Sequence, residues 1–270
     1  MMLWKTIGYT ACIMFHHLKK SDISSLYSRT PKSASFVMAT ECGDCIQKDA
    51  KWASLKEFCS QLDVTDEPKS DPNILDTDVI GIAESRLIST DENEDFYVPG
   101  FEPPVRLDQK QNNFNTRPPH GLVLYYRTDC FLHNTFTYST PHLEFVKADI
   151  ISSSKGLFQV VFVYKAPHCK FTQLKDVFLA DLLPDVYLRH PKIIIMGDFN
   201  FDLNTGNTSF FKFMRDTFCC SQIVSKPTTS YGTVLDLIFL NFDSRVNFET
   251  DVLDSYWSDH NVIYVAIETQ

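Results

Sequence analysis

The stretch Lys192-Ile-Ile-Ile-Met-Gly-Asp-Phe-Asn-Phe-Asp-Leu203 holds a short apolar run that is followed at once by polar side chains. The β-branched residues from Ile193 to Met196 predict a strand buried on both faces. Gly197 ends the run, and Asp198 and Asn200 follow it. A carboxylate and a carboxamide at the rim of a rigid core suit chemistry on a phosphate, which depends on positioning. An Asx-type turn explains the same residues, so this stretch alone leaves both interpretations open.

The composition describes a packed globular chain with an uneven distribution of charge. Of 270 residues, 44 % are hydrophobic, and the chain has 22 Phe but only 9 Gly. This excludes a disordered protein and predicts a substantial core. The formal net charge is −9, which by itself argues against a nucleic-acid partner. However, 13 of the 34 acidic side chains lie between residues 61 and 108, which carry only 3 basic ones. A local acidic segment does not exclude a metal-dependent nuclease.

The eight cysteines do not have the spacing of a disulfide scaffold. Cys42 and Cys45 form a CxxC pair, but no second pair completes a zinc set, so we expect free thiols in a reducing compartment. The apolar run from Ile7 to Phe15 is too short to cross a bilayer and lacks a cleavage site. We therefore expect an intracellular protein, nuclear or cytoplasmic, with no membrane association.

The chain reads as a poorly defined leader over residues 1–35 and a single domain over residues 36–270. Residues 35–40 are expected to form the first strand, and residues 52–62 have the apolar spacing of a helix. Residues 63–76 and 89–104 are acidic loops. Further strands are expected at residues 78–83, 122–127, 143–151, 158–164, 193–196, 234–240 and 261–267, with helices at 171–183 and 209–218. Strands that alternate irregularly with few helices predict an α/β fold, a four-layer sandwich of two packed mixed β-sheets flanked by α-helices.

Polar side chains lie at or near the ends of many of these strands. A charged group directly after a buried run such as Val79–Ala83 is costly unless it is paired or binds a cation. Several acids beside a histidine suit a hard cation such as Mg²⁺ together with a general base. Each position alone fits a structural role, but so many in one chain favour a site: Glu84, Tyr164, Asp198, Asn200, Asp236, Asp259 and His260.

Four short motifs, in this order, resemble those of the endonuclease/exonuclease/phosphatase superfamily. They are Ile82-Ala-Glu-Ser85, Gly197-Asp-Phe-Asn200, Leu235-Asp-Leu-Ile238 and Ser258-Asp-His260. Two stretches, residues 117–126 and 222–239, are similar to the endonuclease domains of mobile elements, namely Helitrons and non-LTR retrotransposons. The resemblance covers about residues 74–270 and implies a DNA endonuclease that nicks DNA by Mg²⁺-assisted attack of water. It also implies a domain that is monomeric and was once fused to reverse transcriptase or helicase domains.

The resemblance implies a role for each residue of this set. Glu84 and Asp259 would be metal ligands for Mg²⁺, with Mn²⁺ as a substitute. Asp198 would orient or deprotonate the attacking water, and Asn200 would hold that water or the phosphate. His260, paired with Asp236, would stabilise charge on the scissile phosphate, and Tyr164 would be a phenol near it. Because the net charge is negative, DNA binding would depend on a few local cations near the cleft, and five basic residues are candidates, each of which could equally be a solubilising surface charge: Lys110, Arg117, Arg127, Lys165 and Lys170.

One feature departs from the family pattern. An Asn is expected at the end of the first strand, beside the metal-binding Glu, but the chain has no Asn before Asn73, and Thr40 or Glu41 stands near the expected position. This leaves activity in doubt and keeps a second hypothesis open, in which the chain is a catalytically weakened relic or a nucleic-acid-binding module. A phosphatase acting on a small phosphoester is the third and weakest hypothesis.

Overall fold

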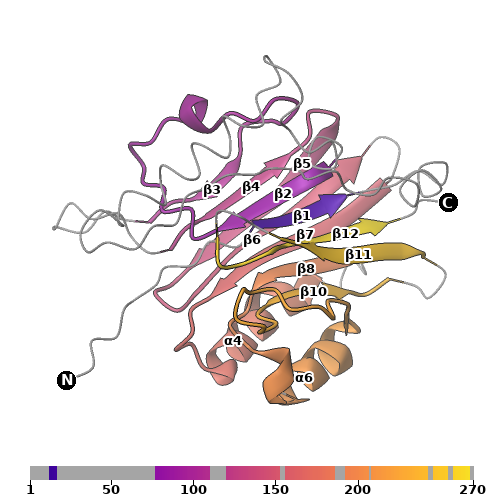
Figure 1. The fold of residues 1–270 in the computed structure, drawn as a ribbon. Helices are drawn as coiled ribbons and strands as arrows, with labels where there is room; N and C mark the ends of the chain where they lie inside the picture. Colours follow the sequence, from indigo (N-terminus) through magenta and orange to yellow (C-terminus); the bar gives the residue numbers. More distant parts are fainter. Residues whose placement is uncertain are drawn as a thin grey trace, which may run out of the picture.

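The computed structural model describes residues 12–16, as backbone only, together with 77–109, 120–152, 156–185, 192–206, 208–242, 246–254 and 258–267. Within these ranges, two six-stranded sheets pack face to face (Figure 1). The first sheet has the order β11-β12-β1-β2-β4-β3. Its strands are β1 (Cys12–His16), β2 (Thr77–Ala83), β3 (Val105–Leu107), β4 (Leu122–Tyr126), β11 (Phe248–Leu253) and β12 (Val262–Ile267).

The second sheet has the order β5-β6-β7-β8-β10-β9. Its strands are β5 (Cys130–Ser139), β6 (Leu143–Ser152), β7 (Gly156–Lys165), β8 (Ile193–Asp198), β9 (Ser221–Gln222) and β10 (Asp236–Leu240). Both sheets are mixed, because β1 runs parallel to β12 and β7 runs parallel to β8. The predicted strands at 78–83, 122–127, 143–151, 158–164, 193–196, 234–240 and 261–267 are therefore confirmed.

The two sheets approach each other closely over a shared apolar core. A Cβ atom on Gly81 of β2 would lie 2.8 Å from the ring of Phe162 on β7, so only glycine fits opposite that ring. Phe158, Val160 and Phe162 alternate along β7 and are all buried. This period of two points one face of the strand into the space between the sheets.

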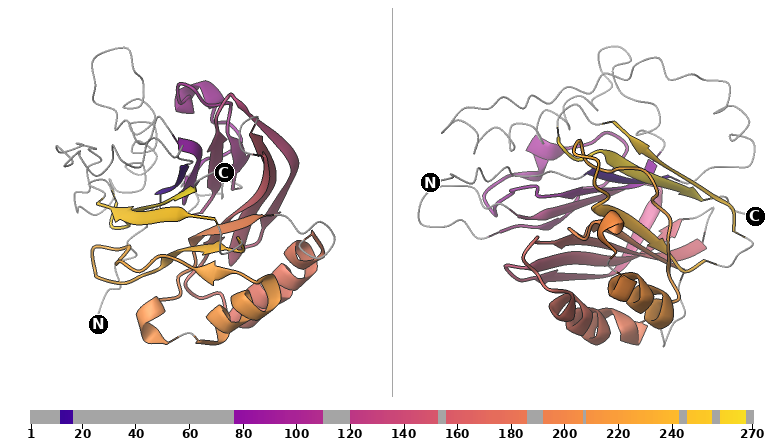
Figure 2. Two further views of the ribbon diagram at one scale, coloured as in Figure 1. Left: turned by 90° about the vertical axis from the view of Figure 1, so that its right-hand side faces the viewer. Right: turned by 60° about the horizontal axis from the view of Figure 1, so that its bottom comes forward.

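The helices cover the outer face of the second sheet (Figure 2). They are α4 (Phe171–Val177), the π-helical turn η2 (Phe178–Leu182) and α6 (Thr208–Phe218), so both predicted helices in this region are confirmed. Phe178 contacts Phe145 and Phe218 edge to face, at 6.3 and 6.0 Å between ring centroids. Two shorter 3₁₀ turns complete the helical elements of the described ranges, η1 (Asn93–Phe96) and η3 (Leu203–Thr205).

The segment between β2 and β3 is more than the acidic loop that its sequence suggested. Phe96, Val98 and Phe101 are buried in a second apolar cluster with Ile80 and Tyr125 of the first sheet. The Tyr125 hydroxyl donates to the carbonyl of Phe96 at 2.8 Å. This segment therefore packs on the first sheet through its apolar residues, while Glu92, Glu94 and Asp95 are exposed.

The predicted α/β sandwich of two packed mixed sheets is confirmed, and the described residues show its helical layer on the second sheet. The helix expected at 52–62, the strand expected at 35–40 and the pair Cys42 and Cys45 lie outside the described ranges. The sequence analysis missed β3, β5 and β11. None of these strands has a buried apolar run, since most of β5 is exposed and β3 and β11 are at most half-buried.

A strand also lies inside residues 1–35, where the sequence analysis expected a leader. β1 runs antiparallel to β2, with Cys12 opposite Ile82 and His16 opposite Thr77. The carboxyl end of β1 is thus at the opposite end of the sheet from Glu84, which follows β2. Of the helices in the described part of the chain, none has the length and apolar character needed to span a bilayer.

Candidate active site

Three polar side chains form one row across neighbouring strands of the second sheet. Tyr164 near the end of β7 is directly opposite Asp198, the last residue of β8. Asp198 is in turn opposite Asp236, the first residue of β10. Directly paired residues share a face of the sheet. The strand register alone therefore brings a phenol and two carboxylates together.

Gly197 makes the close approach of β7 and β8 possible at this edge. Its φ is +150°, and a Cβ atom there would lie only 1.9 Å from the carbonyl oxygen of Val163. No other residue fits without moving β8 away from β7. Close packing of β7 and β8 therefore requires glycine at position 197. From the sequence alone, Gly197 was recognised only as the end of an apolar run.

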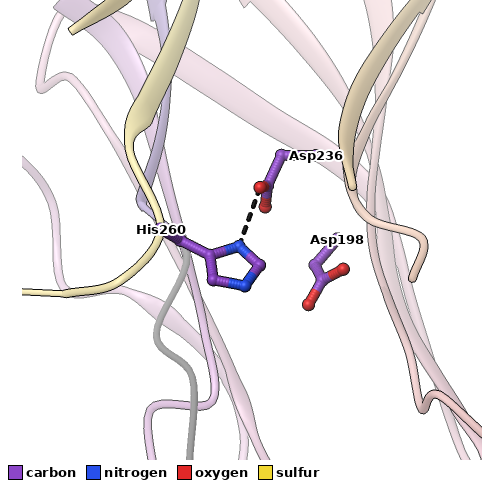
Figure 3. Close-up of side chains that lie close together, drawn as sticks. All are labelled: Asp198, Asp236 and His260. Carbon is purple, nitrogen blue, oxygen red and sulfur yellow. Dashed lines mark hydrogen bonds and ion pairs between the residues drawn. The ribbon is translucent and has the colours of Figure 1, made fainter. Parts of the chain in front are cut away.

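His260 reaches this row from the other sheet and pairs with Asp236. Its Nδ1 lies 2.7 Å from Oδ2 of Asp236, and the two side chains are 1 % and 0 % exposed. Figure 3 shows the Asp198 carboxylate beside this pair, and ligand atoms of the three residues lie within 4.8 Å of one another. Burial lowers the pKa of His260, but the Asp236 carboxylate outweighs burial and raises this pKa to about 10. The imidazole is therefore a cation at neutral pH.

Buried Thr228 is hydrogen-bonded to the backbone beside both Asp236 and His260. The hydroxyl oxygen of Thr228 accepts hydrogen bonds from the backbone N–H groups of Leu235 and Asp236, at 3.0 and 3.1 Å. The carbonyl of Thr228 accepts from the N–H of Asn261 at 2.8 Å, one residue beyond His260. This connection gives a structural purpose to the Thr-rich stretch before β10.

Asn200 holds Asp198 in place. Its backbone N–H donates to Oδ1 of Asp198 at 2.9 Å, and its side-chain Nδ2 donates to Oδ2 at 3.0 Å. The same Nδ2 donates to the carbonyl of Lys165 at 2.8 Å. An amide nitrogen has two hydrogens, so both are engaged within the protein. Asn200 therefore orients the Asp198 carboxylate, and only its carbonyl oxygen remains for a water or a substrate.

Glu84 joins the site through Tyr164. The phenol donates to Oε1 of Glu84 at 2.8 Å, and Glu84 is only 7 % exposed. Burial, followed by the charges of Glu84 and Asp198, raises the pKa of Tyr164, so the phenol stays protonated and remains a donor. Glu84 has a φ of 55°, a left-handed conformation that is rare outside glycine.

Asp259 is half-buried beside His260. Its backbone carbonyl accepts from the N–H of Ser230 at 2.9 Å, and its charge contributes to the raised pKa of His260. The structure thus brings all seven residues predicted from the sequence to one end of the sandwich.

The chemistry of these side chains fits a divalent cation. Burial, and then the charge of Asp236, raises the pKa of Asp198 to about 8, which indicates more negative charge than the site neutralises by itself. Oδ1 of Asp236 is buried and accepts no hydrogen bond from the described residues. Carboxylate oxygens of this kind are the ligands that Mg²⁺ and Mn²⁺ prefer.

No protein-family model matches the sequence, and no curated protein matches it. Solved structures do match. An endonuclease/exonuclease/phosphatase family protein from Bacteroides thetaiotaomicron has a TM-score of 0.55 at 13 % identity, over 94 % of this chain and 96 % of that one. A mannosyl-6-phosphatase from the same organism has a TM-score of 0.53 at 12 % identity, over 95 % and 99 %. A family protein from Leptotrichia buccalis has a TM-score of 0.51 at 16 % identity, over 96 % and 100 %.

The chain has the endonuclease/exonuclease/phosphatase fold. Identities this low show the fold and not the substrate. Within this fold, the site described above lies where the motifs of the sequence converge, at the ends of β2, β7 and β8 and the starts of β10 and β12.

Sequence reasoning missed three further residues near the site. Glu144 is a buried carboxylate beside Tyr164 on β6. The Arg86 guanidinium is largely buried, and burial lowers its pKa, although Glu84 and Tyr164 oppose this effect. The ring of His120 is 5.2 Å from that of Tyr164. Arg86 and His120 follow or precede predicted strand ends and could have been found by that signal, whereas Glu144 sits inside a strand.

The five basic residues expected near the cleft have different positions. Lys110 and Arg117 lie outside the described ranges. Arg127 follows the far end of β4, with its N–H bonded to the carbonyl of Asp78, and pairs with Asp129. Lys165 is fully buried, with its ammonium 4.2 Å from the centroid of the Phe201 ring. The expectation of a surface contact is therefore wrong for Lys165 and wrongly placed for Arg127, while Lys170 is exposed directly after the site loop.

Proposed function

We propose that the chain is a divalent-metal-dependent phosphodiester hydrolase and that it nicks DNA. The observation that carries this proposal is the buried group of Asp198, Asp236 and His260, within 4.8 Å of one another, beside the pair of Glu84 and Tyr164. Three carboxylates, an imidazolium and a phenol in one place are the parts that hydrolysis of a phosphodiester requires. A buried cluster of this charge has a high energetic cost without such a use.

Glu84 and Asp259 would hold the cation, which we take to be Mg²⁺ with Mn²⁺ as a substitute. When bound, it would offset the negative charge of the phosphate. Tyr164 keeps the Glu84 carboxylate oriented by donating to one of its oxygens at 2.8 Å. The other carboxylate oxygen of Glu84 would coordinate the cation, and Tyr164 would act as a positioning group.

Asp198 is the group that would accept a proton from the attacking water. Its pKa is raised to about 8 by burial and by Asp236. A base whose pKa lies near the working pH is effective, because it is both available and strong enough. Asn200 engages both oxygens of the carboxylate, at 2.9 and 3.0 Å, and so fixes the direction in which the water can lie.

His260 would stabilise the charge that builds on the phosphate. Asp236 holds its Nδ1 at 2.7 Å and keeps the ring protonated. A donor that is already in place costs no reorganisation during the reaction, and removal of one such donor typically lowers the rate by about 10²–10³. The pair therefore acts mainly on turnover.

The DNA substrate and the mobile-element origin rest on the sequence motifs. Residues 222–239 resemble the endonuclease domains of Helitrons and non-LTR retrotransposons, and the Thr228 connection shows that this stretch supports Asp236 and His260. A second candidate function is a phosphatase for small phosphoesters, because one protein of the same fold is a mannosyl-6-phosphatase. A binding module without activity is the third candidate.

A plasmid-nicking assay tests the proposal. Supercoiled plasmid is incubated with the protein and Mg²⁺, with Mn²⁺, or with EDTA, and Glu84→Ala is measured over a series of Mg²⁺ concentrations. We expect nicking only with metal and a higher Mg²⁺ requirement for Glu84→Ala, since a ligand is lost. Binding of DNA without nicking in either metal would favour the binding module, and hydrolysis of sugar phosphates alone would favour the phosphatase.

A further inference from the structure

The buried carboxylate of Glu144 lies next to the site but has no part in the chemistry above. It is 1 % exposed near the start of β6, directly opposite Tyr164 on β7. Its Oε2 accepts from the N–H of Gly121 at 2.9 Å. Its Oε1 accepts from the Ser139 hydroxyl at 3.2 Å and from the side-chain amide of Gln109. Both oxygens are therefore engaged by donors of the protein.

Two of these donors belong to segments that hold the backbone directly after Glu84. The N–H of Ser85 donates to the carbonyl of Gly121, and the N–H of Arg86 donates to the carbonyl of His120, both at 3.0 Å. The N–H of Gln109 donates to the carbonyl of Leu87 at 3.2 Å. Glu144 thus links the two segments that are hydrogen-bonded to residues 85–87.

The backbone at this point needs such support. Glu84 and Arg86 have φ values of 55° and 58°, in the left-handed region. A residue held there is strained and keeps that conformation only when its surroundings impose it. Gly121 has a φ of +110°, and a Cβ atom there would lie 2.8 Å from the hydroxyl of Ser85. The contact between the two segments is therefore close as well as hydrogen-bonded.

We propose that Glu144 is a positioning residue for Glu84. Its hydrogen bonds fix Gln109 and the segment 120–121. These in turn hold the backbone of residues 85–87, which orients the Glu84 carboxylate toward the site. The inference rests on the proposed function in one respect, that Glu84 is a ligand of the cation. Glu144 is not itself a ligand, because three donors occupy its oxygens. It acts from the second sheet on a residue of the first.

The test uses Glu144→Gln in the whole chain, with Asp149→Asn as the matched control. Asp149 is another buried carboxylate of β6, hydrogen-bonded to Gln159 and Asn134, but it lies five residues further along the strand, which is roughly 16 Å at 3.3 Å per residue. Two quantities are measured for each protein. One is the dissociation constant for Mn²⁺ by calorimetry, and the other is the hydrogen exchange of the amides of Gly121, Ser85 and Arg86.

We expect Glu144→Gln to weaken Mn²⁺ binding about tenfold, as is typical when a group behind a metal ligand is lost. We also expect faster exchange of the three amides, with neither change in Asp149→Asn even if both variants melt at lower temperature. Unchanged exchange, or faster exchange with unchanged Mn²⁺ affinity, would overturn the inference. If Glu144→Gln does not fold, Gln109→Ala removes one donor and must show both effects in weaker form, or the inference fails.

These outcomes separate the inference from the proposed function. A wild-type chain that binds Mn²⁺ tightly, loses that affinity in Glu144→Gln and yet nicks no DNA would refute the proposed nuclease while supporting the role of Glu144. A wild-type chain that nicks DNA while Glu144→Gln binds Mn²⁺ normally would do the reverse. A wild-type chain that binds no Mn²⁺ would refute both.

Discussion

The candidate active site has two halves that are held in place by different means. In the half that contains Asp198, Asp236 and His260, strand register, one buried ion pair and hydrogen bonds from the adjoining turns hold the side chains. In the half that contains Glu84 and Tyr164, the carboxylate follows β2 on a left-handed residue, and contacts from other segments fix it. The side chains of the first half lie on or beside regular strands, with one left-handed residue at Asn200, whose φ is 47°. In the second half the metal-binding carboxylate itself belongs to a left-handed residue, Glu84.

This difference indicates how each half should respond to change. Register and burial are properties of the whole sheet, so the Asp236 half should tolerate small changes in the surrounding loops, except at Thr228, which bonds to the backbone of Asp236 itself. The Glu84 half depends on a few hydrogen bonds between segments, so single substitutions there should alter its geometry while the fold persists.

The largest expected effect is on turnover, from His260→Ala. The substitution removes the imidazolium that Asp236 keeps protonated, so we expect the nicking rate to fall by about 10²–10³. DNA affinity and the Mg²⁺ requirement should stay near wild type, because the Glu84 half is intact. His133→Ala on β5, an exposed histidine, is the control. A changed Mg²⁺ requirement with an unchanged rate would show that the two halves have been assigned the wrong way round.

The second prediction concerns stability without metal. Among the carboxyl groups and histidines of the described residues, three have a folded-state pKa above the ordinary value: Glu144 at about 7, Asp198 at about 8 and His260 at about 10. The folded state therefore holds protons that the unfolded state releases, so stability is lost as pH rises. For Glu144, a rise from 4.5 to about 7 corresponds to roughly 3 kcal/mol, lost between those two values.

Melting temperatures from about pH 5 to pH 8 check this sign. The metal-free protein should melt at progressively lower temperature as pH rises, and Glu144→Gln should have a shallower slope. Added Mg²⁺ should also flatten the slope, since a cation held by Glu84 and Asp259 would lower the pKa of the nearby Asp198 carboxyl. A melting temperature that rises over this interval would contradict the raised pKa values in both halves.

The same contrast explains how much could be predicted from the sequence. The strands that carry Asp198, Asp236 and His260 are continuous apolar runs, and polar residues at their ends stand out against that background. The sequence predicted these strands and side chains because burial on both faces leaves a strong pattern. The sequence did not predict that the side-chain amide of Asn200 donates hydrogen bonds to both Asp198 and Lys165. These bonds depend on the turn conformation after β8.

Elements without such a pattern were missed. Most of the residues of β5 are exposed, so its sequence has no apolar alternation to detect. Glu144 looked like one polar residue within a strand, because its partners Gly121 and Gln109 lie far from it in the sequence. Lys165 looked like a surface cation, although the ring of Phe201 covers it. Long-range contacts decide these cases, and local sequence does not encode them.

The third prediction tests the connection within the Asp236 half. Thr228→Val removes the hydroxyl that accepts hydrogen bonds from the N–H groups of Leu235 and Asp236, at 3.0 and 3.1 Å, of which only the second is fully buried. Leaving one buried donor unsatisfied typically costs about 1–3 kcal/mol, so we expect a loss of about 2 kcal/mol in chemical unfolding. Turnover should fall while Mn²⁺ affinity stays unchanged. Thr250→Val, on a half-buried edge strand, should lower the free energy of unfolding by less. An equal loss in the two variants would show that Thr228 does not contribute more than an ordinary threonine.

The smallest expected effect concerns the affinity for DNA and lies outside both halves. Lys170 is exposed at the start of α4, directly after the loop that leaves β7 at the site, whereas Lys165 is buried and Arg127 lies at the far end of β4. If Lys170 contacts one phosphate, Lys170→Ala should reduce the slope of log affinity against log salt by about 0.9, with no effect on metal affinity. Lys175→Ala, an exposed lysine one turn further along the same helix, and Arg127→Ala should leave the slope unchanged. Equal slopes for all three variants and the wild type would place the DNA-binding surface elsewhere. A reduced slope for Arg127→Ala alone would put the DNA at the opposite end of the sandwich from the carboxylates, which is incompatible with cleavage at this site.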